Sequence, residues 1–119
     1  MDLIEKVASK RKILKYQYNG NYYSQASKKL RRSSAKIQAY ISECEEKLSE
    51  INSDTSDSYG DAIDDFKDGI KNYKSKILNA MEKASRKMKN IDLAADKAYE
   101  KAERYYELAE DEKTKSIEN

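Results

Sequence analysis

Apolar and small residues in the second half of the chain recur at the spacing of an α-helix. From Tyr59 to Ala109 they follow one another at steps of one, three or four positions, and no proline interrupts them. Such spacing keeps one face of a helix apolar. It predicts one helix from about residue 58 to about residue 112, followed by a frayed tail over 113–119. The stripe consists of Tyr59, Ala62, Ile63, Phe66, Ile70, Tyr73, Ile77, Met81, Ala84, Met88, Ile91, Ala95, Ala98, Ala102, Tyr105 and Ala109.

The first half of the chain shows the same kind of pattern less regularly, and it predicts a helix over about 2–52. Asn19-Gly20 is a turn signal between two apolar stripes. Because a glycine inside a helix costs only about 1 kcal/mol relative to alanine, a continuous or kinked helix and a break into two helices both remain open. The upstream stripe is Leu3, Ile4, Val7, Leu14 and Tyr18. The downstream stripe is Ala26, Leu30, Ile37, Ile41, Cys44, Leu48 and Ile51, with Ser33 and Ser34 at its missing position.

A polar segment separates the two halves. Residues 52–58 are all Asn, Ser, Thr or Asp, whose side chains bond nearby backbone groups in place of continuing a helix. We therefore expect a loop over 52–58. Two long helices joined by a short central loop fold back on each other. The predicted fold is all-α, a long antiparallel two-helix hairpin that forms a single domain over 1–119.

The residue inventory argues against an enzyme. The chain has no histidine and one cysteine, Cys44, so the usual zinc, haem and Cys–His sites lack their parts. Cys44 falls on the apolar stripe, which favours a buried small apolar residue over a reactive thiol. We expect no catalytic residue, no metal site and no cofactor.

Apolar runs in this chain are short. None is long enough for a membrane-spanning helix, and residues 1–20 lack the apolar core of a cleavable signal peptide. We expect no membrane insertion, and any export would use a route without a cleavable signal.

Charge is distributed in bands. Residues 1–40 carry ten basic and two acidic side chains, residues 41–68 two and ten, and residues 69–91 seven and one. A hairpin folded about residue 55 places like charges side by side, which is unfavourable when they face each other. Either these are solvated faces, or the bands select a partner of complementary charge. The basic sets brought together are Lys28, Lys29, Arg31 and Arg32 on one side and Lys74, Lys76 and Lys83 on the other.

A lone two-helix hairpin buries little apolar surface relative to the entropy that its ordering costs. We therefore expect a second helical protein alongside, in a homodimer or a heterodimer. The ten tyrosines, against one phenylalanine, are the candidates for this contact, because tyrosine suits surfaces that are buried yet wet at the edge. Alternatively, they are ordinary large seam residues. The candidates at the open end are Tyr16, Tyr18, Tyr22, Tyr23, Tyr99, Tyr105 and Tyr106.

The segment from Ser58 to Phe66 resembles the turn of the WXG-type small helical hairpins. Gly60 matches the family glycine, Ala62 the alanine two residues later and Phe66 the aromatic residue six later. Ser58 stands at the family's tryptophan position, and the nearest aromatic residue is Tyr59. With this departure, the chain is most similar to the divergent helical partner proteins of LXG toxins in the type VII secretion system of Gram-positive bacteria.

This resemblance implies a non-enzymatic partner or targeting protein. It would bind the helical N-terminal region of an LXG-type toxin, or a sister hairpin, in the bacterial cytoplasm, and it could be exported with its cargo. The family's export signal, Tyr-x-x-x-Asp/Glu, is matched by Tyr99 with Glu103 and by Tyr106 with Glu110. The alternatives are a structural coiled-coil protein and a nucleic-acid-binding helical protein that uses the basic run 28–32. The net charge of only +2 disfavours nucleic acid.

Overall fold

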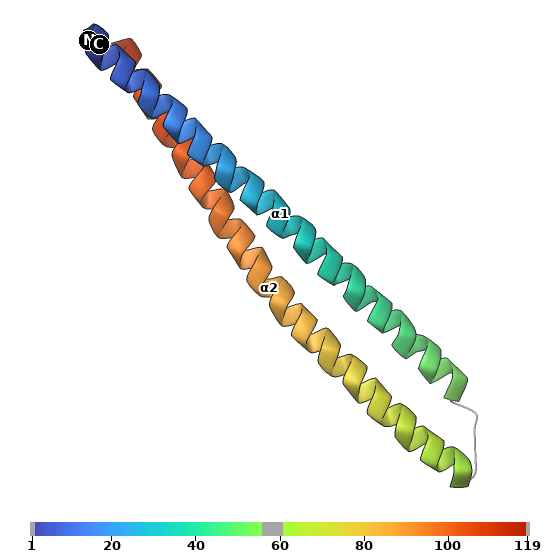
Figure 1. Ribbon diagram of the computed structural model, residues 1–119. Helices are drawn as coiled ribbons and strands as arrows, with labels where there is room; N and C mark the ends of the chain where they lie inside the picture. The colour runs from blue at the N-terminus through green and yellow to red at the C-terminus, as the bar shows by residue number, and fades with distance from the viewer. Residues whose placement is uncertain (1, 56–60, 119) are drawn as a thin grey trace. The chain divides into compact units, whose positions relative to one another are not determined.

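The computed structural model describes the backbone of residues 2–55 and 61–118, and the side chains of residues 2–51 and 64–117. Two long helices make up this part of the chain, α1 (Leu3–Thr55) and α2 (Asp61–Glu118) (Figure 1). The prediction of an all-α helical hairpin is confirmed. The chain divides into unit 1 (Met1–Arg32 with Ile91–Asn119) and unit 2 (Ser33–Asn90).

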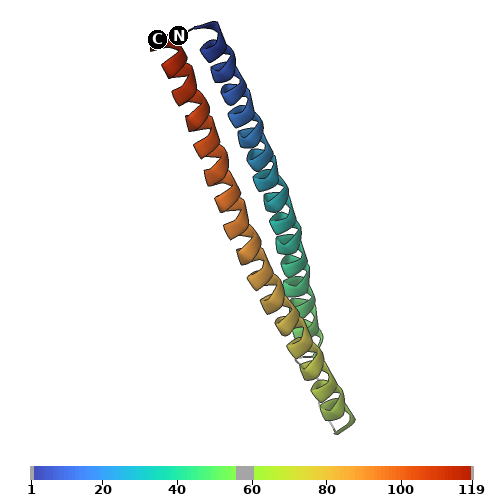
Figure 2. The ribbon, with the colours of Figure 1, turned by 60° about the vertical axis from the view of Figure 1, so that its left-hand side comes forward.

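In unit 1 the two helices run antiparallel, side by side, with the chain termini at the same end (Figures 1 and 2). Near the termini, Ser9 Oγ donates a hydrogen bond to Glu112 Oε1 at 2.8 Å. Farther along, Ser27 Oγ donates to the Ala95 carbonyl oxygen at 2.9 Å. Because buried polar groups have to find partners, these bonds fix the register of the two helices.

The face of α1 that forms the helix–helix seam is a regular heptad series. Its positions alternate steps of four and three residues, and each is buried or half-buried. This is the spacing of a coiled-coil seam. Serine, glycine and tyrosine occupy much of its first half, so the series is apolar only downstream. Its members are Ser9, Ile13, Tyr16, Gly20, Tyr23, Ser27, Leu30, Ser34, Ile37, Ile41, Cys44, Leu48 and Ile51.

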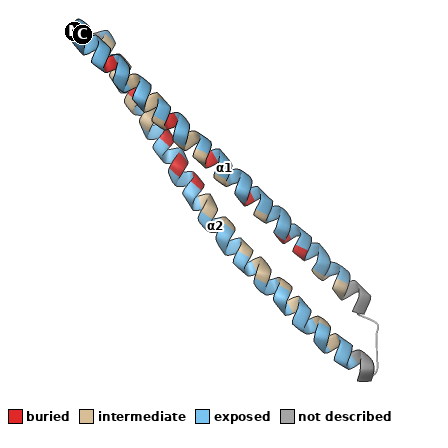
Figure 3. Cartoon of the chain, in the orientation of Figure 1, coloured by how far each residue is buried: buried red, intermediate tan, exposed pale blue. Residues whose placement is uncertain are grey.

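The corresponding series on α2 has the same alternation. In unit 1 its core is alanine: Ala95, Ala98, Ala102 and Ala109 are at most 9% exposed (Figure 3). Such small side chains allow two helix backbones to approach closely. The whole series is Lys67, Ile70, Lys74, Ile77, Met81, Ala84, Met88, Ile91, Ala95, Ala98, Ala102, Tyr105, Ala109, Glu112 and Ser116.

α1 is continuous through Asn19-Gly20, which excludes the break left open by the sequence. Gly20 is buried against the ring of Tyr106. A Cβ at this position would lie 2.6 Å from Tyr106 Cε1, well inside the carbon–carbon contact distance of about 3.5 Å. Gly20 therefore lies inside a continuous helix and not in a turn, and its lack of a side chain leaves room for the Tyr106 ring.

The N-terminus of α1 is capped by Asp2. Its Oδ1 atom accepts a hydrogen bond from the Glu5 backbone N–H at 2.8 Å, and its carbonyl oxygen accepts one from the Lys6 N–H. At the other end, α1 continues to Thr55, so the predicted loop over 52–58 was wrong for residues 52–55. A polar composition of this kind lowers the preference for a helix without excluding it, so it does not fix the last helical residue.

α2 continues to Glu118, so the helix extends through most of the segment 113–119 for which the sequence predicted a frayed tail. Thr114 Oγ1 donates to the Glu110 carbonyl oxygen at 3.0 Å, and Ser116 Oγ donates to that of Glu112 at 3.1 Å. Ser116 Oγ also lies 2.6 Å from Ser9 Oγ on α1, a hydrogen bond in which either hydroxyl can be the donor. This contact joins the polar tail to α1, and a pattern of apolar residues does not predict it.

The expected juxtaposition of basic bands does not hold at Arg31. Its Nη2 atom lies 2.8 Å from Asp96 Oδ1, in an ion pair with both side chains more than half exposed. A fold about residue 55 would have placed Arg31 near Lys76 and Lys83. The register follows the small seam contacts of unit 1 instead, so opposite charges meet at this position.

Candidate partner-binding faces

Part of the tyrosine cluster packs inside unit 1. The rings of Tyr23 and Tyr105 stack in parallel with centroids 5.8 Å apart, and those of Tyr16 and Tyr105 are tilted at 6.3 Å. Lys101 Nζ lies 5.1 Å from the Tyr23 ring centroid, a cation–π distance. These tyrosines join α1 to α2. They are therefore seam residues, which was the alternative to a role in partner binding.

Tyr106 belongs to the same seam. Its hydroxyl donates to Asn21 Oδ1 at 2.7 Å, while its ring covers Gly20. The ring and the hydroxyl are both engaged with α1. The two candidate export signals therefore differ, because the tyrosine of the pair Tyr106–Glu110 already packs against α1.

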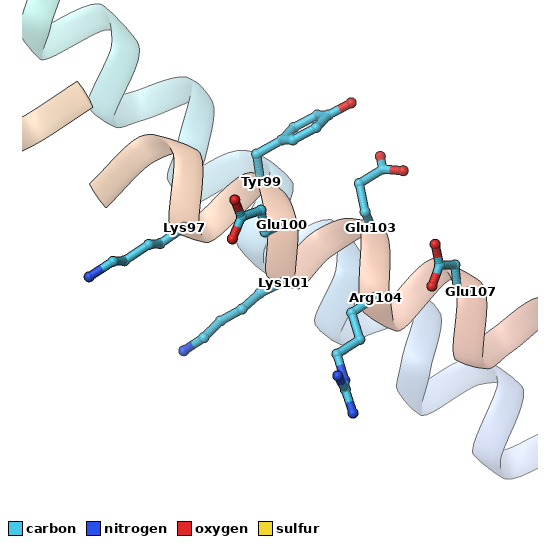
Figure 4. A pocket seen from close by; sticks show the side chains of 7 residues that line it. All are labelled: Lys97, Tyr99, Glu100, Lys101, Glu103, Arg104 and Glu107. Carbon is cyan, nitrogen blue, oxygen red and sulfur yellow. The ribbon is translucent and has the colours of Figure 1, made fainter. Parts of the chain in front are cut away.

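Tyr99 and Glu103 form the other candidate signal and lie on the surface of α2. Tyr99 is 55% exposed. Figure 4 shows Tyr99 and Glu103 projecting from the same side of the helix, as their i,i+4 spacing requires. The surrounding shallow hollow is lined mainly by charged side chains: Lys97, Tyr99, Glu100, Lys101, Glu103, Arg104 and Glu107. This face of α2 is polar and accessible.

Tyr18 and Tyr22 project from α1 into solvent, with exposed fractions of 70% and 62%. The Tyr22 ring contacts Tyr23 edge-on, with centroids 5.2 Å apart. Together with the upstream apolar stripe, these side chains form a second face of α1 outside the seam. The stripe that the sequence singled out upstream of Asn19 is therefore largely exposed, since Leu3, Ile4 and Leu14 are 78%, 81% and 63% exposed.

The four basic candidates of α1, Lys28, Lys29, Arg31 and Arg32, are all exposed. Arg31 also forms an ion pair with Asp96 of α2. Sequence reasoning did not single out Arg11, which is exposed and lines a hollow with Leu3, Ile4, Val7 and Ala8. The sequence did contain a signal for this position: from Ser9 onward the seam positions alternate in steps of four and three residues. This alternation places Arg11 and its neighbours off the seam, on the other face of α1.

In unit 2 the apolar stripe of α2 is incompletely covered. No described residue from Asp64 to Asn90 is buried. Phe66 and Tyr73, one heptad apart, are 60% and 52% exposed. By contrast, Ile41 and Cys44 of α1 are buried, at 6% and 7% exposed, which confirms the expected placement of Cys44. Unit 2 therefore presents aromatic side chains beside a half-buried seam.

Of the turn motif, Ser58, Tyr59 and Gly60 lie outside the described residues. Ala62 lies in the first turn of α2, and its side chain is also outside the described set. Phe66 is the member whose side chain is placed, and it is exposed. The motif thus reaches the accessible surface at Phe66.

Tyr40 and Cys44, one helical turn apart on α1, interact through their side chains. A hydrogen bond with the Cys44 side chain, followed by electrostatic interaction with the same group, raises the pKa of Tyr40 above its ordinary value. Among the described residues, no group of three His, Cys, Asp or Glu side chains is arranged to hold a metal ion. Within the same residues, neither helix has a stretch apolar enough to cross a membrane.

No protein-family model, curated protein or solved structure matches this chain.

Proposed function

We propose that this chain is a non-enzymatic helical partner protein of a type VII secretion substrate, which binds the helical N-terminal region of an LXG-type toxin or a sister hairpin. The observation that carries the proposal is the exposed pair Phe66 and Tyr73 beside the half-buried seam of α2. A second support is the resemblance of the segment 58–66 to the turn of WXG-type hairpins.

The α2 segment of unit 2 has the composition of an interface. Ile70, Ile77 and Met81 recur at helical spacing and are only half-buried, and the two neighbouring aromatic side chains are more than half exposed. Aromatic residues and methionine are enriched at protein–protein contacts, where a few of them supply most of the binding energy. A partner that covers this stripe would remove apolar surface from water at about 25 cal/mol per Å².

A helical partner suits this stripe better than a globular one. Phe66, Tyr73 and the half-buried series repeat at three, four and seven residues, which is how an apolar helix face presents anchors to another helix. The N-terminal region of an LXG-type toxin is expected to be helical, as is a sister hairpin. Either would lie along α2 and complete a bundle.

Tyr99 and Glu103 are the preferred export signal in this proposal. They form one accessible patch on α2, whereas the Tyr106 ring and hydroxyl are held by Gly20 and Asn21. A secretion machinery that reads a tyrosine and an acidic residue at i,i+4 can contact the first pair without disrupting the fold.

Binding is tested with the helical N-terminal regions of the proteins encoded by the neighbouring open reading frames, among which we propose an LXG-type toxin or a sister hairpin. We expect the double substitution Phe66→Ala and Tyr73→Ala to weaken the complex by about 30-fold or more, because buried aromatic anchors contribute about 2 kcal/mol or more. The measurement is isothermal titration calorimetry, with circular dichroism to verify helicity. Leu93→Ala is the matched control, since Leu93 is 53% exposed on α2 in unit 1.

An unchanged affinity of the Phe66 and Tyr73 double variant would show that unit 2 is not the toxin-binding surface. A stable self-assembly that captures no toxin, seen by light scattering, would favour the structural coiled-coil alternative. A steep loss of affinity for duplex DNA with increasing salt would favour the nucleic-acid alternative.

A further inference from the structure

The face of α1 opposite the seam of unit 1 is apolar along its centre. Its side chains lie about half a helical turn from the seam positions. All of them are at least 45% exposed, and three exceed 65%. This outer face comprises Leu3, Ile4, Val7, Leu14, Tyr18 and Tyr22. It is separate from the Phe66–Tyr73 surface, which belongs to α2 and to unit 2.

Two shallow hollows on this outer face have the geometry that receives a helix. The first, of about 320 Å³, is lined by Leu3, Ile4, Val7, Ala8 and Arg11. The second, of about 390 Å³, is lined by Tyr18, Asn21, Tyr22, Gln25, Ala26 and Lys29. Each lining contains one quartet with the spacing i, i+3, i+4, i+7, which forms the hole for one knob in coiled-coil packing. The quartets begin at residues 4 and 18, two heptads apart.

From Lys6 onward, the charged side chains of α1 around the outer face are all basic. No acidic residue occurs between Lys6 and Ser42, and Asp2 and Glu5 precede this stretch. Lys10, Lys15 and Lys29 are exposed beside the apolar positions. Arg11 lies within the stripe itself, one turn after Val7 and two turns before Tyr18. Because a guanidinium brought into an interface is stabilised by a carboxylate, a complementary surface has to be acidic.

We propose that the outer face of α1 binds an acidic amphipathic helix of another protein. Heptad-spaced apolar residues of that helix enter the two hollows, and one of its carboxylates pairs with Arg11. This contact goes beyond the proposed function, because it uses another helix and another unit and does not depend on type VII secretion.

Other occupants fit less well. A second copy of this face would bring two basic surfaces together. The outer face of α2 in a second copy carries as many basic side chains (Lys97, Lys101 and Arg104) as acidic ones (Glu100, Glu103 and Glu107), so it lacks the excess of negative charge that a complement to this face requires. A lipid bilayer would require a broad apolar face, whereas Arg11, Asn21 and Gln25 interrupt this narrow one.

The test uses the full chain and a synthetic helix of about four heptads. The peptide carries leucine at its a and d positions, except for one central glutamate, and glutamate at e and g. The control peptide carries lysine at e and g. By fluorescence anisotropy, we expect the acidic peptide to bind about ten-fold or more tightly than the basic one.

Variants locate the contact. Leu14→Asp should weaken binding of the acidic peptide about ten-fold or more. Leu93→Asp is the matched control, because Leu93 is also an exposed leucine but lies on α2. Arg11→Glu should weaken binding as well, and a peptide with lysine in place of its central glutamate should restore it. Since Leu14 is 63% exposed, both aspartate variants should retain parent helicity by circular dichroism.

Equal binding of the acidic peptide by the parent chain and by Leu14→Asp would overturn the proposal. So would binding to vesicles of phosphatidylserine and phosphatidylcholine without binding to the peptide. The double substitution of Phe66 and Tyr73 should leave peptide binding unchanged. Failure of the toxin interaction and failure of this contact are therefore separately visible.

Discussion

Replacement of Gly20 by alanine tests whether the contact between Gly20 and Tyr106 controls helix packing in unit 1. At an unconstrained helix position, this change stabilises the folded state by about 1 kcal/mol, because glycine has more conformational freedom to lose. At Gly20 the new Cβ would lie 2.6 Å from Tyr106 Cε1 and 2.8 Å from Cδ1. The Tyr106 ring would therefore have to move.

Two costs oppose the gain in helix propensity. Overpacking of a tight contact costs about 1–3 kcal/mol. Displacement of the ring also breaks the hydrogen bond from the Tyr106 hydroxyl to Asn21 Oδ1, whose net contribution is about 0.5–1.5 kcal/mol. The balance is a destabilisation of about 0.5–3.5 kcal/mol for Gly20→Ala.

Gly69 provides the matched control, because an added Cβ there meets no atom within 4 Å. Gly69→Ala should stabilise the chain by about 1 kcal/mol. The free energy of unfolding is measured by urea denaturation, with circular dichroism as the readout. The measurement is made at two protein concentrations to detect any self-association. Stabilisation by Gly20→Ala to the same extent as by Gly69→Ala would refute the packing argument.

A double-mutant cycle isolates the contact. In a Tyr106→Ala background the obstructing ring is gone, so Gly20→Ala should stabilise by about 1 kcal/mol, as at an open position. Persistence of the destabilisation in this background would place its cause elsewhere than in the Tyr106 ring.

Ala102, which is 1% exposed, should not accept a larger side chain. Ala102→Leu is expected to cost about 1–3 kcal/mol by overpacking, whereas Ala94→Leu, at an exposed position of the same helix, should change the free energy of unfolding by less than about 0.5 kcal/mol. For the proposed export signal, Tyr99→Ala is expected to abolish secretion without loss of stability, while Tyr106→Ala should lower stability. Secretion by the Tyr99 variant at the parent level would exclude Tyr99 as part of the signal.

The sequence alone determined the fold class and the approximate extent of both helices. The apolar series from Ile70 to Ala109 has a period that suits only a helix, and the polar segment 52–58 predicts the interruption between the helices, which end at Thr55 and begin again at Asp61. These are local properties, since spacing along one helix decides which residues share a face. The same reasoning placed Cys44 on a buried face.

Which face of α1 packs on α2 was decided by tertiary structure. Apolar character favoured Leu3, Val7 and Leu14, yet the seam passes through Ser9, Gly20 and Ser27 instead. Small residues allow close approach of the backbones and leave room for the tyrosine rings, while their polar groups find partners across the seam. Close backbone approach and hydrogen bonds across the seam require both helices, so the pattern of apolar residues along one helix does not predict them.

The register between the helices has the same origin. Tyr106 fits against Gly20, Ser27 bonds to the Ala95 carbonyl oxygen, and Arg31 consequently meets Asp96. Each contact joins residues more than sixty positions apart in the chain. The sequence carries these residues, but only the packed helices determine which of them meet, because that choice minimises voids and unpaired polar groups across the whole seam.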